Sequence, residues 1–201
     1  MIIYKGRDLN RKRINHLTSE VESIFDSIDN IVLAGGAVRT LIDRTPIIDY
    51  DFFIISNNIE EQNKTKEEFK KFMKLNGFSI IFQCPEDKLI SFRSRFSGIK
   101  FQLIMNQIYP TMFSLLNSFD IIAAAMAIDK NNFYALSYYA IKSAKFKRIE
   151  FNTIHYPVAT LSRIDKYKKK GYSISEESYR NYFIKIREGD LNDLNFRKYI
   201  D

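Results

Sequence analysis

The sequence predicts an α+β fold, in which a small mixed β-sheet domain with helices on one face is followed by a helical extension. Short apolar runs bounded by turn residues indicate strands in the first half of the chain, and from residue 112 the apolar residues recur at helical spacing. A hydrophobic share of 45% is sufficient for a folded core. The pattern changes near residue 110 and again near 137, and we divide the chain into a sheet domain at 1–137 and an extension at 138–201.

Helices and strands are expected to alternate in the first half. Apolar residues at helical spacing predict helices at residues 9–28, 37–42 and 59–76. Short apolar runs predict strands at residues 31–34, 49–55, 78–82, 89–96 and 99–105. Gly77 is expected to cap the third helix, and Gly98 is expected to lie in a tight turn that makes the last two strands a hairpin.

The second half is expected to be mostly helical. Residues 112–128, which contain the run from Ala123 to Ala127, predict one long helix. A short strand is expected near residues 133–136. Further helices are expected at residues 138–147, 158–170 and 176–187.

Residue counts exclude several classes of protein. A single cysteine, Cys84, excludes an internal disulfide and is typical of a reducing compartment. Only two histidines, His16 and His155, occur far apart in the chain, which argues against a His-based zinc site or catalytic triad. No apolar run approaches the ~20 residues of a spanning helix, and charged residues follow the first methionine too closely for a signal peptide. We therefore expect a cytoplasmic protein with no membrane association.

The net charge of +7 is compatible with a polyanionic partner such as nucleic acid. It is equally compatible with a soluble basic protein that binds no polyanion. Charge alone therefore does not decide between these two interpretations.

A Gly-Gly step lies between a predicted strand and a predicted helix, at Gly35 and Gly36. Such a step lets a ligand approach the backbone closely, and it presents N–H groups at a helix N-terminus, where a phosphate can bind. The alternative is a buried turn with no ligand.

Two aspartates, Asp49 and Asp51, begin the second strand of the predicted sheet. Alternate residues of a strand point to the same face, so the two carboxylates would lie side by side next to apolar neighbours. This is costly unless a cation neutralises them, and Mg²⁺ prefers carboxylate oxygens that it shares with phosphates. The alternative is that Asp49 lies in the turn after Pro46. The Gly-Gly step upstream and the apolar strand downstream favour the metal site.

Residues 33–42, which read Leu-Ala-Gly-Gly-Ala-Val-Arg-Thr-Leu-Ile, and residues 48–52, which read Ile-Asp-Tyr-Asp-Phe, resemble the head-domain signature of CCA-adding enzymes and bacterial poly(A) polymerases. These enzymes are polymerase-β-like nucleotidyltransferases. The resemblance implies a palm-like nucleotidyltransferase domain that binds an NTP such as ATP. It also implies that Gly35, Gly36 and Arg39 contact the triphosphate, and that Asp49 and Asp51 bind two magnesium ions.

A second block, residues 119–129, resembles the family segment Arg-Arg-Asp-Phe-Thr-Ile-Asn-Ala-Met-Ala-Tyr-Asp. Asp120 matches the aspartate that helps hold the ribose in that family. The arginine pair is replaced by Ser118 and Phe119, and the asparagine by Ala124. The residues alone also permit Asp120 to be only the N-cap of a helix.

A third block, residues 161–172, resembles the Arg-rich helix at the start of the family's neck. On a helix Arg163, Lys166 and Lys170 share one face, from which they could reach a triphosphate or an RNA backbone. A solvated charged face is the alternative.

Two further observations concern the strands at 89–96 and 99–105. Arg93 and Arg95 share one face of a strand, next to Phe92 and Phe96, and could contact RNA; half-exposed arginines at a sheet edge are the alternative. The family usually has a third acid on a later strand, where this chain offers Gln102. Glutamine is a poor base for deprotonating a hydroxyl.

The resemblance covers about residues 30–172, whereas the family enzymes continue into long helical domains that grip tRNA. It implies a magnesium-dependent nucleotidyltransferase that moves a nucleoside monophosphate from an NTP to an acceptor hydroxyl, expected to be an RNA 3′ end. The alternative, which Gln102 keeps open, is an inactive protein that retains the fold and acts as a nucleotide-binding, RNA-binding or structural module.

Overall fold

The computed structural model of the protein describes residues 1–5 and 18–188. The first part of the helix expected at 9–28, including His16, lies outside these residues. The main sheet has eight strands in the order β1 (Ile2–Lys5), β8 (Asn132–Ala135), β7 (Met126–Ile128), β2 (Ile31–Ala34), β3 (Asp49–Ile55), β6 (Lys100–Tyr109), β5 (Leu89–Ser94) and β4 (Phe78–Gln83). Only β3 and β6 run parallel, so the sheet is mixed and the predicted α+β class is confirmed.

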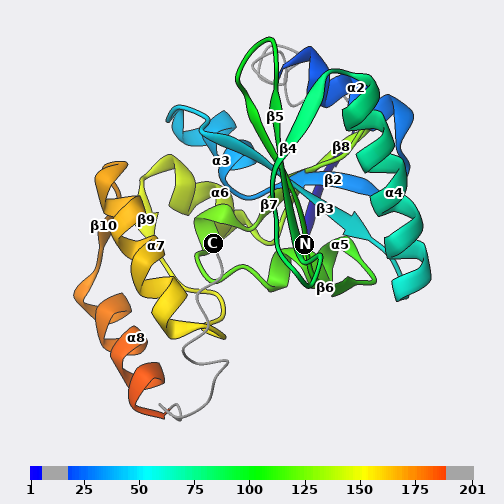
Figure 1. Ribbon diagram of the computed structural model, residues 1–201. Coiled ribbons are helices and arrows are strands. Elements are labelled where there is room, and N and C mark those ends of the chain that lie inside the picture. Colours follow the sequence, from blue (N-terminus) through cyan, green and yellow to red (C-terminus); the bar gives the residue numbers. More distant parts are fainter. Residues whose placement is uncertain (6–17, 189–201) are drawn as a thin grey trace.

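The helices of the sheet domain are α2 (Ser19–Ser27), α3 (Gly36–Asp43), α4 (Ile59–Leu75), α5 (Met112–Asn117) and the 3₁₀ helix η2 (Ile122–Ala124). The described residues from 138 on, which we call the extension, form the helices α6 (Tyr138–Lys145), α7 (Pro157–Lys169) and α8 (Glu176–Glu188). They also form a small parallel sheet of β9 (Arg148–Ile149) and β10 (Ser173–Ile174). Figure 1 shows α7 and α8 beside the sheet domain, on the side where α3 and α6 lie.

The two faces of the sheet are buried unequally. Tyr50, Phe52 and Ile54 point to one face, where they join the main core together with side chains of α2, α3 and α4. Phe53 points to the other face and packs with a smaller cluster that includes Leu115 of α5. Because α5 covers only part of this second face, polar side chains can occupy the remainder of it.

The long helix expected at 112–128 is wrong. A capping box of Thr111 and Ser114 starts α5, which ends at Asn117. The chain then forms η2, and β7 pairs with both β2 and β8. A continuous apolar run fits a buried strand as well as a buried helix, and here the packing between two strands overrides the helix propensity of alanine.

The hairpin and the helix cap that the glycines predict are confirmed. Gly98 has φ +71° and its N–H donates to Ser94 O in the β5–β6 turn, and Gly77 has φ +78° directly after α4. Strand β1 was not expected; it pairs with β8 at the sheet's edge. In the described part of the chain, no helix has the length and apolar character that a membrane crossing demands.

Phe52→Ala is expected to lower the free energy of unfolding by about 3–5 kcal/mol, because its buried ring contacts those of Phe25, Phe69 and Phe101. Urea denaturation measures the loss. Phe96→Ala is the matched control, because the side chain of Phe96 is 89% exposed, and it should cost no more than about 0.5 kcal/mol. Equal losses in the two variants would contradict this description of the core.

Candidate active site

The two aspartates lie side by side on the second face of the sheet. Strand β3 begins at Asp49, so this residue is not in the turn after Pro46. Both side chains are partly exposed. In the parallel pairing with β6, Asp49 lies opposite Lys100 and Asp51 lies opposite Gln102.

Gln102 connects the two carboxylates. With its amide nitrogen facing them, it donates to Asp51 Oδ1 at 3.1 Å and to Asp49 Oδ2 at 3.2 Å, while its oxygen accepts from Ser91 Oγ at 3.1 Å and Lys100 Nζ at 3.2 Å. These contacts lower the repulsion between the two carboxylates, but a neutral amide does not neutralise them as a cation would. Gln102 therefore occupies the position next to the two aspartates where the family resemblance leads us to expect a third acid.

The two carboxylates could hold a hard cation only if a substrate supplied further oxygen ligands. Two carboxylates on one face supply the oxygen ligands that Mg²⁺ prefers, and Mg²⁺ usually completes its shell with phosphates and water. In residues 1–5 and 18–188, no group of three or more Asp, Glu, His or Cys side chains could hold a metal ion.

The two glycines have different roles. Gly35 has φ +76°, its N–H donates to Met126 O at 3.0 Å, and a Cβ here would lie 3.2 Å from Phe119 Cε1. Its N–H is thus used within the fold. A Cβ on Gly36 would meet nothing within 4 Å, and Gly36 opens α3, whose first N–H groups have no partner within the helix. A phosphate could therefore approach at Gly36 and not at Gly35.

Arg39 was expected to contact a triphosphate, but its side chain is only 1% exposed. Its guanidinium lies 4.9 Å from the ring centre of Tyr167 and 5.4 Å from that of Tyr172, both from the extension. Nη1 lies 3.3 Å from Asp43 Oδ2, and Nη2 donates to Thr45 Oγ1 at 3.1 Å. Arg39 therefore links α3 to the extension.

The tyrosines around Arg39 stay neutral. Burial raises the pKa of Tyr167 to about 12. Burial, together with the hydrogen bond that its hydroxyl donates to Asp43 Oδ2 at 2.6 Å, also raises the pKa of Tyr172. Both rings can thus pack against the guanidinium without adding charge.

Asp120 and Arg163, both expected to contact nucleotide, are joined to each other. Asp120 Oδ2 accepts from Arg163 Nη1 and from Thr160 Oγ1, each at 2.7 Å, and Oδ1 accepts from the N–H of Ile121 at 2.8 Å. The residue is 9% exposed. It does not cap an α-helix, because the element that follows is η2, whose N-cap is Ile121. Asp120 therefore holds α7 against the sheet domain.

The basic face predicted for residues 163–170 divides in two. Arg163 turns toward Asp120, whereas Lys166 is exposed. Lys170 is partly buried: burial and the charge of Arg39 lower the pKa of Lys170, and the negative charge of Asp49 acts in the opposite direction.

Arg93 lies on the same face as the acids, because it is opposite Lys100 across β5 and β6. Both Arg93 and Arg95 are exposed, and Arg95 Nε donates to Ser79 Oγ at 2.9 Å. Strand β5 lies inside the sheet, so Arg93 is not at the sheet's edge. Lys100 was not among the predicted site residues. Because alternate residues of a strand share a face, its position two residues before Gln102 would have indicated that it lies on the face of the acids.

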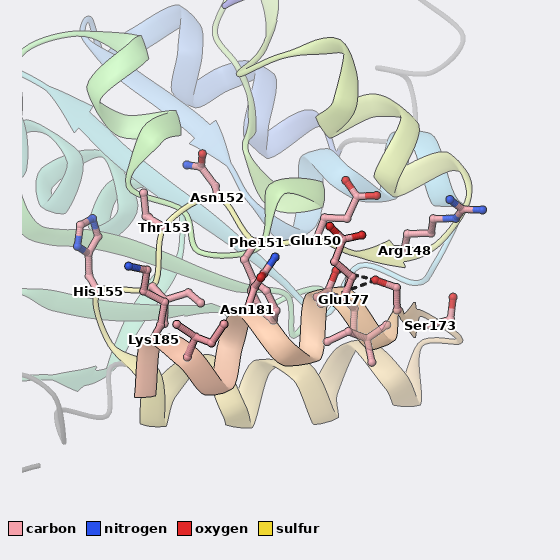
Figure 2. A pocket seen from close by; sticks show the side chains of 16 residues that line it. Arg148, Glu150, Phe151, Asn152, Thr153, His155, Ser173, Glu177, Asn181 and Lys185 are labelled. Atoms are coloured by element: carbon pink, nitrogen blue, oxygen red, sulfur yellow. Dashed lines mark hydrogen bonds between the residues drawn. The ribbon is translucent and has the colours of Figure 1, made fainter. Parts of the chain in front are cut away.

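A groove of about 1180 Å³ opens elsewhere, between α8 and residues 148–155 (Figure 2). None of the predicted site residues lines it. Its charged side chains, Arg148, Glu150, Glu177 and Lys185, are of both signs and indicate no particular ligand.

A family model described as "Gabija anti-defense 2 family protein" matches residues 8–147, more than half of the chain's 201 residues. No protein with a curated description matches the sequence.

The fold is similar to that of tRNA-processing enzymes of known structure. A CCA-adding enzyme in complex with ATP superposes with a TM-score of 0.70 at 18% identity, covering 98% of this chain and 50% of that one. The CCA-adding enzyme of Thermotoga maritima complexed with tRNA gives 0.63 at 14% identity, covering 94% and 46%. A tRNA nucleotidyltransferase with a primer tRNA and an incoming ATP analog gives 0.51 at 18% identity, covering 79% and 47%.

These similarities confirm the nucleotidyltransferase head-domain fold that the motifs predict. The chain spans about half the length of the enzymes that it matches.

Asp120→Ala is expected to cost about 1–3 kcal/mol of stability, because it leaves Arg163 and Thr160 without their carboxylate partner. Urea denaturation gives the loss, and limited proteolysis shows whether the extension is cleaved sooner. Asp165→Ala, an exposed residue of the same helix, should change neither. Equal stability of the two variants would show that this contact does not hold α7.

Gly35→Ala is expected to destabilise the protein by about 1–2 kcal/mol, because the backbone is left-handed there and a Cβ would press on Phe119. Gly36→Ala should leave stability unchanged within about 0.5 kcal/mol, because the space beside it is open. Thermal unfolding of both variants tests the contrast, and the reverse order would contradict the assignment of the two glycines.

Proposed function

The chain belongs to the Gabija anti-defense 2 family and has a nucleotidyltransferase fold, and from this we propose that it is a magnesium-dependent nucleotidyltransferase with an anti-defence role toward Gabija. It transfers a nucleoside monophosphate from an NTP to an acceptor hydroxyl, at an RNA 3′ end. One observation carries the proposal: Asp49 and Asp51 lie side by side at the start of β3, partly exposed, on a face that α5 does not fully cover.

The acids would hold the metal. Two magnesium ions supply the positive charge that stabilises the attacking and the leaving oxygen of an in-line displacement. For either ion to bind, the Gln102 amide must turn so that its oxygen instead of its nitrogen faces the carboxylates.

The triphosphate would lie between the acids and α3. Gly36 offers the open approach and the N–H groups at the helix N-terminus, and Lys170 adds a positive charge near Asp49. The acceptor oxygen attacks the α-phosphorus, the bond to pyrophosphate breaks, and the hydroxyl proton passes to a carboxylate of the pair, since Gln102 cannot accept it. Arg93, Arg95 and Lys166 all have exposed side chains, and in this proposal they contact an RNA backbone.

Arg39, Asp120 and Arg163 act indirectly in this proposal. Their contacts with the extension fix α7 against the sheet domain and so place Lys166 and Lys170 relative to the acids. Gly35 supports the turn that exposes Gly36.

Gln102 favours a second candidate function, in which the protein binds its ligand without catalysis. A neutral amide that donates to both carboxylates stabilises the pair in the absence of metal and cannot serve as the third acid. In this alternative the protein binds NTP or RNA without transferring a nucleotide, and its anti-defence role depends on binding.

Asp51→Asn is expected to reduce nucleotide incorporation by roughly 10³-fold or more, because it removes half of the charge that would hold the metal. Each labelled NTP is incubated with Mg²⁺, a pool of small RNAs and the protein, and product is measured on a gel. Asp165→Asn, on the exposed face of α7, is the control and should retain full incorporation.

NTP binding separates the two candidates. An NTP at ~100 times its Kd should add about 2.7 kcal/mol of stability in either case, and Gly36→Ala should reduce this gain. Binding without incorporation by the wild type supports the second candidate, and no stabilisation by any NTP contradicts both. In an assay of Gabija-dependent defence, an Asp51→Asn protein that still counters the defence would disconnect transfer from the anti-defence role.

A further inference from the structure

Helix α6 turns its large aromatic side chains away from the protein. The positions that face the domain are small residues, Ala140, Ser143 and Ala144, all of them buried. Three large rings are exposed instead: Tyr138 by 63%, Tyr139 by 62% and Phe146 by 57%. In an amphipathic helix the large apolar residues usually face the core, but in α6 the aromatic residues face outward. Packing among residues 1–5 and 18–188 does not account for these rings.

The same surface is strongly basic. Residues 138–148 contain no Asp or Glu and four basic residues: Lys142, Lys145, Lys147 and Arg148. Within the described part of the chain, none of the four forms an ion pair, and Lys145 Nζ lies 5.7 Å from the ring centre of Phe146. Lysines in the last turn of a helix can simply complement its dipole, but that explanation leaves the exposed rings unexplained. We call Tyr138, Tyr139, Lys142, Lys145 and Phe146 the α6 platform.

The platform leads toward the candidate active site. Directly after α6, Lys147 O accepts a hydrogen bond from the N–H of Ser173, and Lys147 Nζ would lie 3.9 Å from a Cβ on Gly171. Gly171 follows Lys170, whose ammonium is in the field of Asp49. The last turn of α7 adds Lys166, Lys168 and Lys169. A run of basic side chains therefore leads from α6 to the end of α7, where the charge of Asp49 acts on Lys170.

We propose that the α6 platform binds single-stranded RNA, with bases stacked on its rings and phosphates at its lysines, and directs the strand's 3′ end along Lys147 and Lys170 to Asp49 and Asp51. Rings interspersed with cations fit a strand whose bases are unpaired, because stacking needs a free base face and the backbone supplies one charge per nucleotide. The rings and lysines are mixed on one face, so α6 has no separate apolar side to enter a bilayer. The delivery of the 3′ end rests on the proposed function, whereas the binding does not.

Fluorescence anisotropy with a labelled, unstructured oligouridylate RNA tests the binding, using the full chain without NTP or Mg²⁺. Tyr139→Ala and Phe146→Ala should each weaken binding by about 5-fold or more, since stacking on one ring is lost. Tyr139→Phe should restore binding because it keeps the ring. Lys142→Gln should lower the slope of log affinity against log salt by about 0.7, because one phosphate contact is lost.

Matched controls on α8 are Phe183→Ala, whose ring is 61% exposed, and Lys185→Gln; both should bind as the wild type does. Unchanged melting temperatures would show that all of these variants fold, as expected for exposed side chains. Wild-type affinity in the Tyr139→Ala Phe146→Ala double variant would overturn the proposal. So would equal affinity for duplex RNA, or capture by anionic lipid vesicles or single-stranded DNA in place of RNA.

The experiment separates this inference from the proposed function. In the Asp49→Asn Asp51→Asn chain, RNA binding should still be weakened by Tyr139→Ala and Phe146→Ala to the same extent, because the platform does not include the acids. If wild-type protein incorporates no nucleotide but its RNA binding depends on Tyr139 and Phe146, the proposed function fails and the platform stands. If incorporation occurs and the platform variants bind and extend RNA as the wild type does, the platform fails and the proposed function stands.

Discussion

The arrangement of the site depends on the contact between the buried guanidinium of Arg39 and two tyrosine rings of the extension. Arg39 belongs to α3, the helix that Gly36 opens, and it is enclosed by Tyr167 and Tyr172 of the extension with Asp43 as its charged partner. Its Nε and Nη1 have no hydrogen-bond partner within the described residues, so the rings and Asp43 must compensate for the buried charge. Loss of one partner of such a buried pair typically costs 3–5 kcal/mol. The position of α7 relative to the acids follows from this contact.

The bond between Asp120 and Arg163 is a second link of the same kind, and both links use residues that the family resemblance assigns to the nucleotide. Arg39 donates to Thr45 and pairs with Asp43 under the two tyrosine rings, and Asp120 pairs with Arg163 of α7, so these groups are engaged within the fold. Lys170 follows α7, which is held at both places, and Lys100 lies opposite Asp49 on the neighbouring strand. Lys100 and Arg93 thus bring positive charge to the face of the acids, whereas Arg39 and Arg163 contact partners within the fold.

The sequence permitted the fold class, the β5–β6 hairpin and the placement of Asp49 and Asp51 on one face, because each follows from a local pattern or a period of two. The partners of Arg39 and Asp120 could not be predicted from the sequence. Tyr172 is 129 residues from Asp43 and Arg163 is 43 from Asp120, and no local pattern encodes contacts at such distances. One local signal was present: Asp43 lies four residues after Arg39 on the same helix, a spacing that predicts an ion pair between them. The prediction of one helix at residues 112–128 was wrong because an alanine-rich run has no periodicity that distinguishes a buried strand from a helix.

The contact of Gln102 with both acids depends on the register of the parallel pair β3–β6, and it changes the argument for a cation. An amide can satisfy two of the carboxylate lone pairs, so the mere survival of two adjacent acids no longer requires a metal. A neutral amide cannot neutralise the two carboxylates, and the backbone at Gly36 stays open to a phosphate. The attraction for a metal–triphosphate complex therefore remains in either candidate function. What the amide removes is a proton acceptor, so the difference between an enzyme and a binding module at this site lies in proton transfer and not in nucleotide binding.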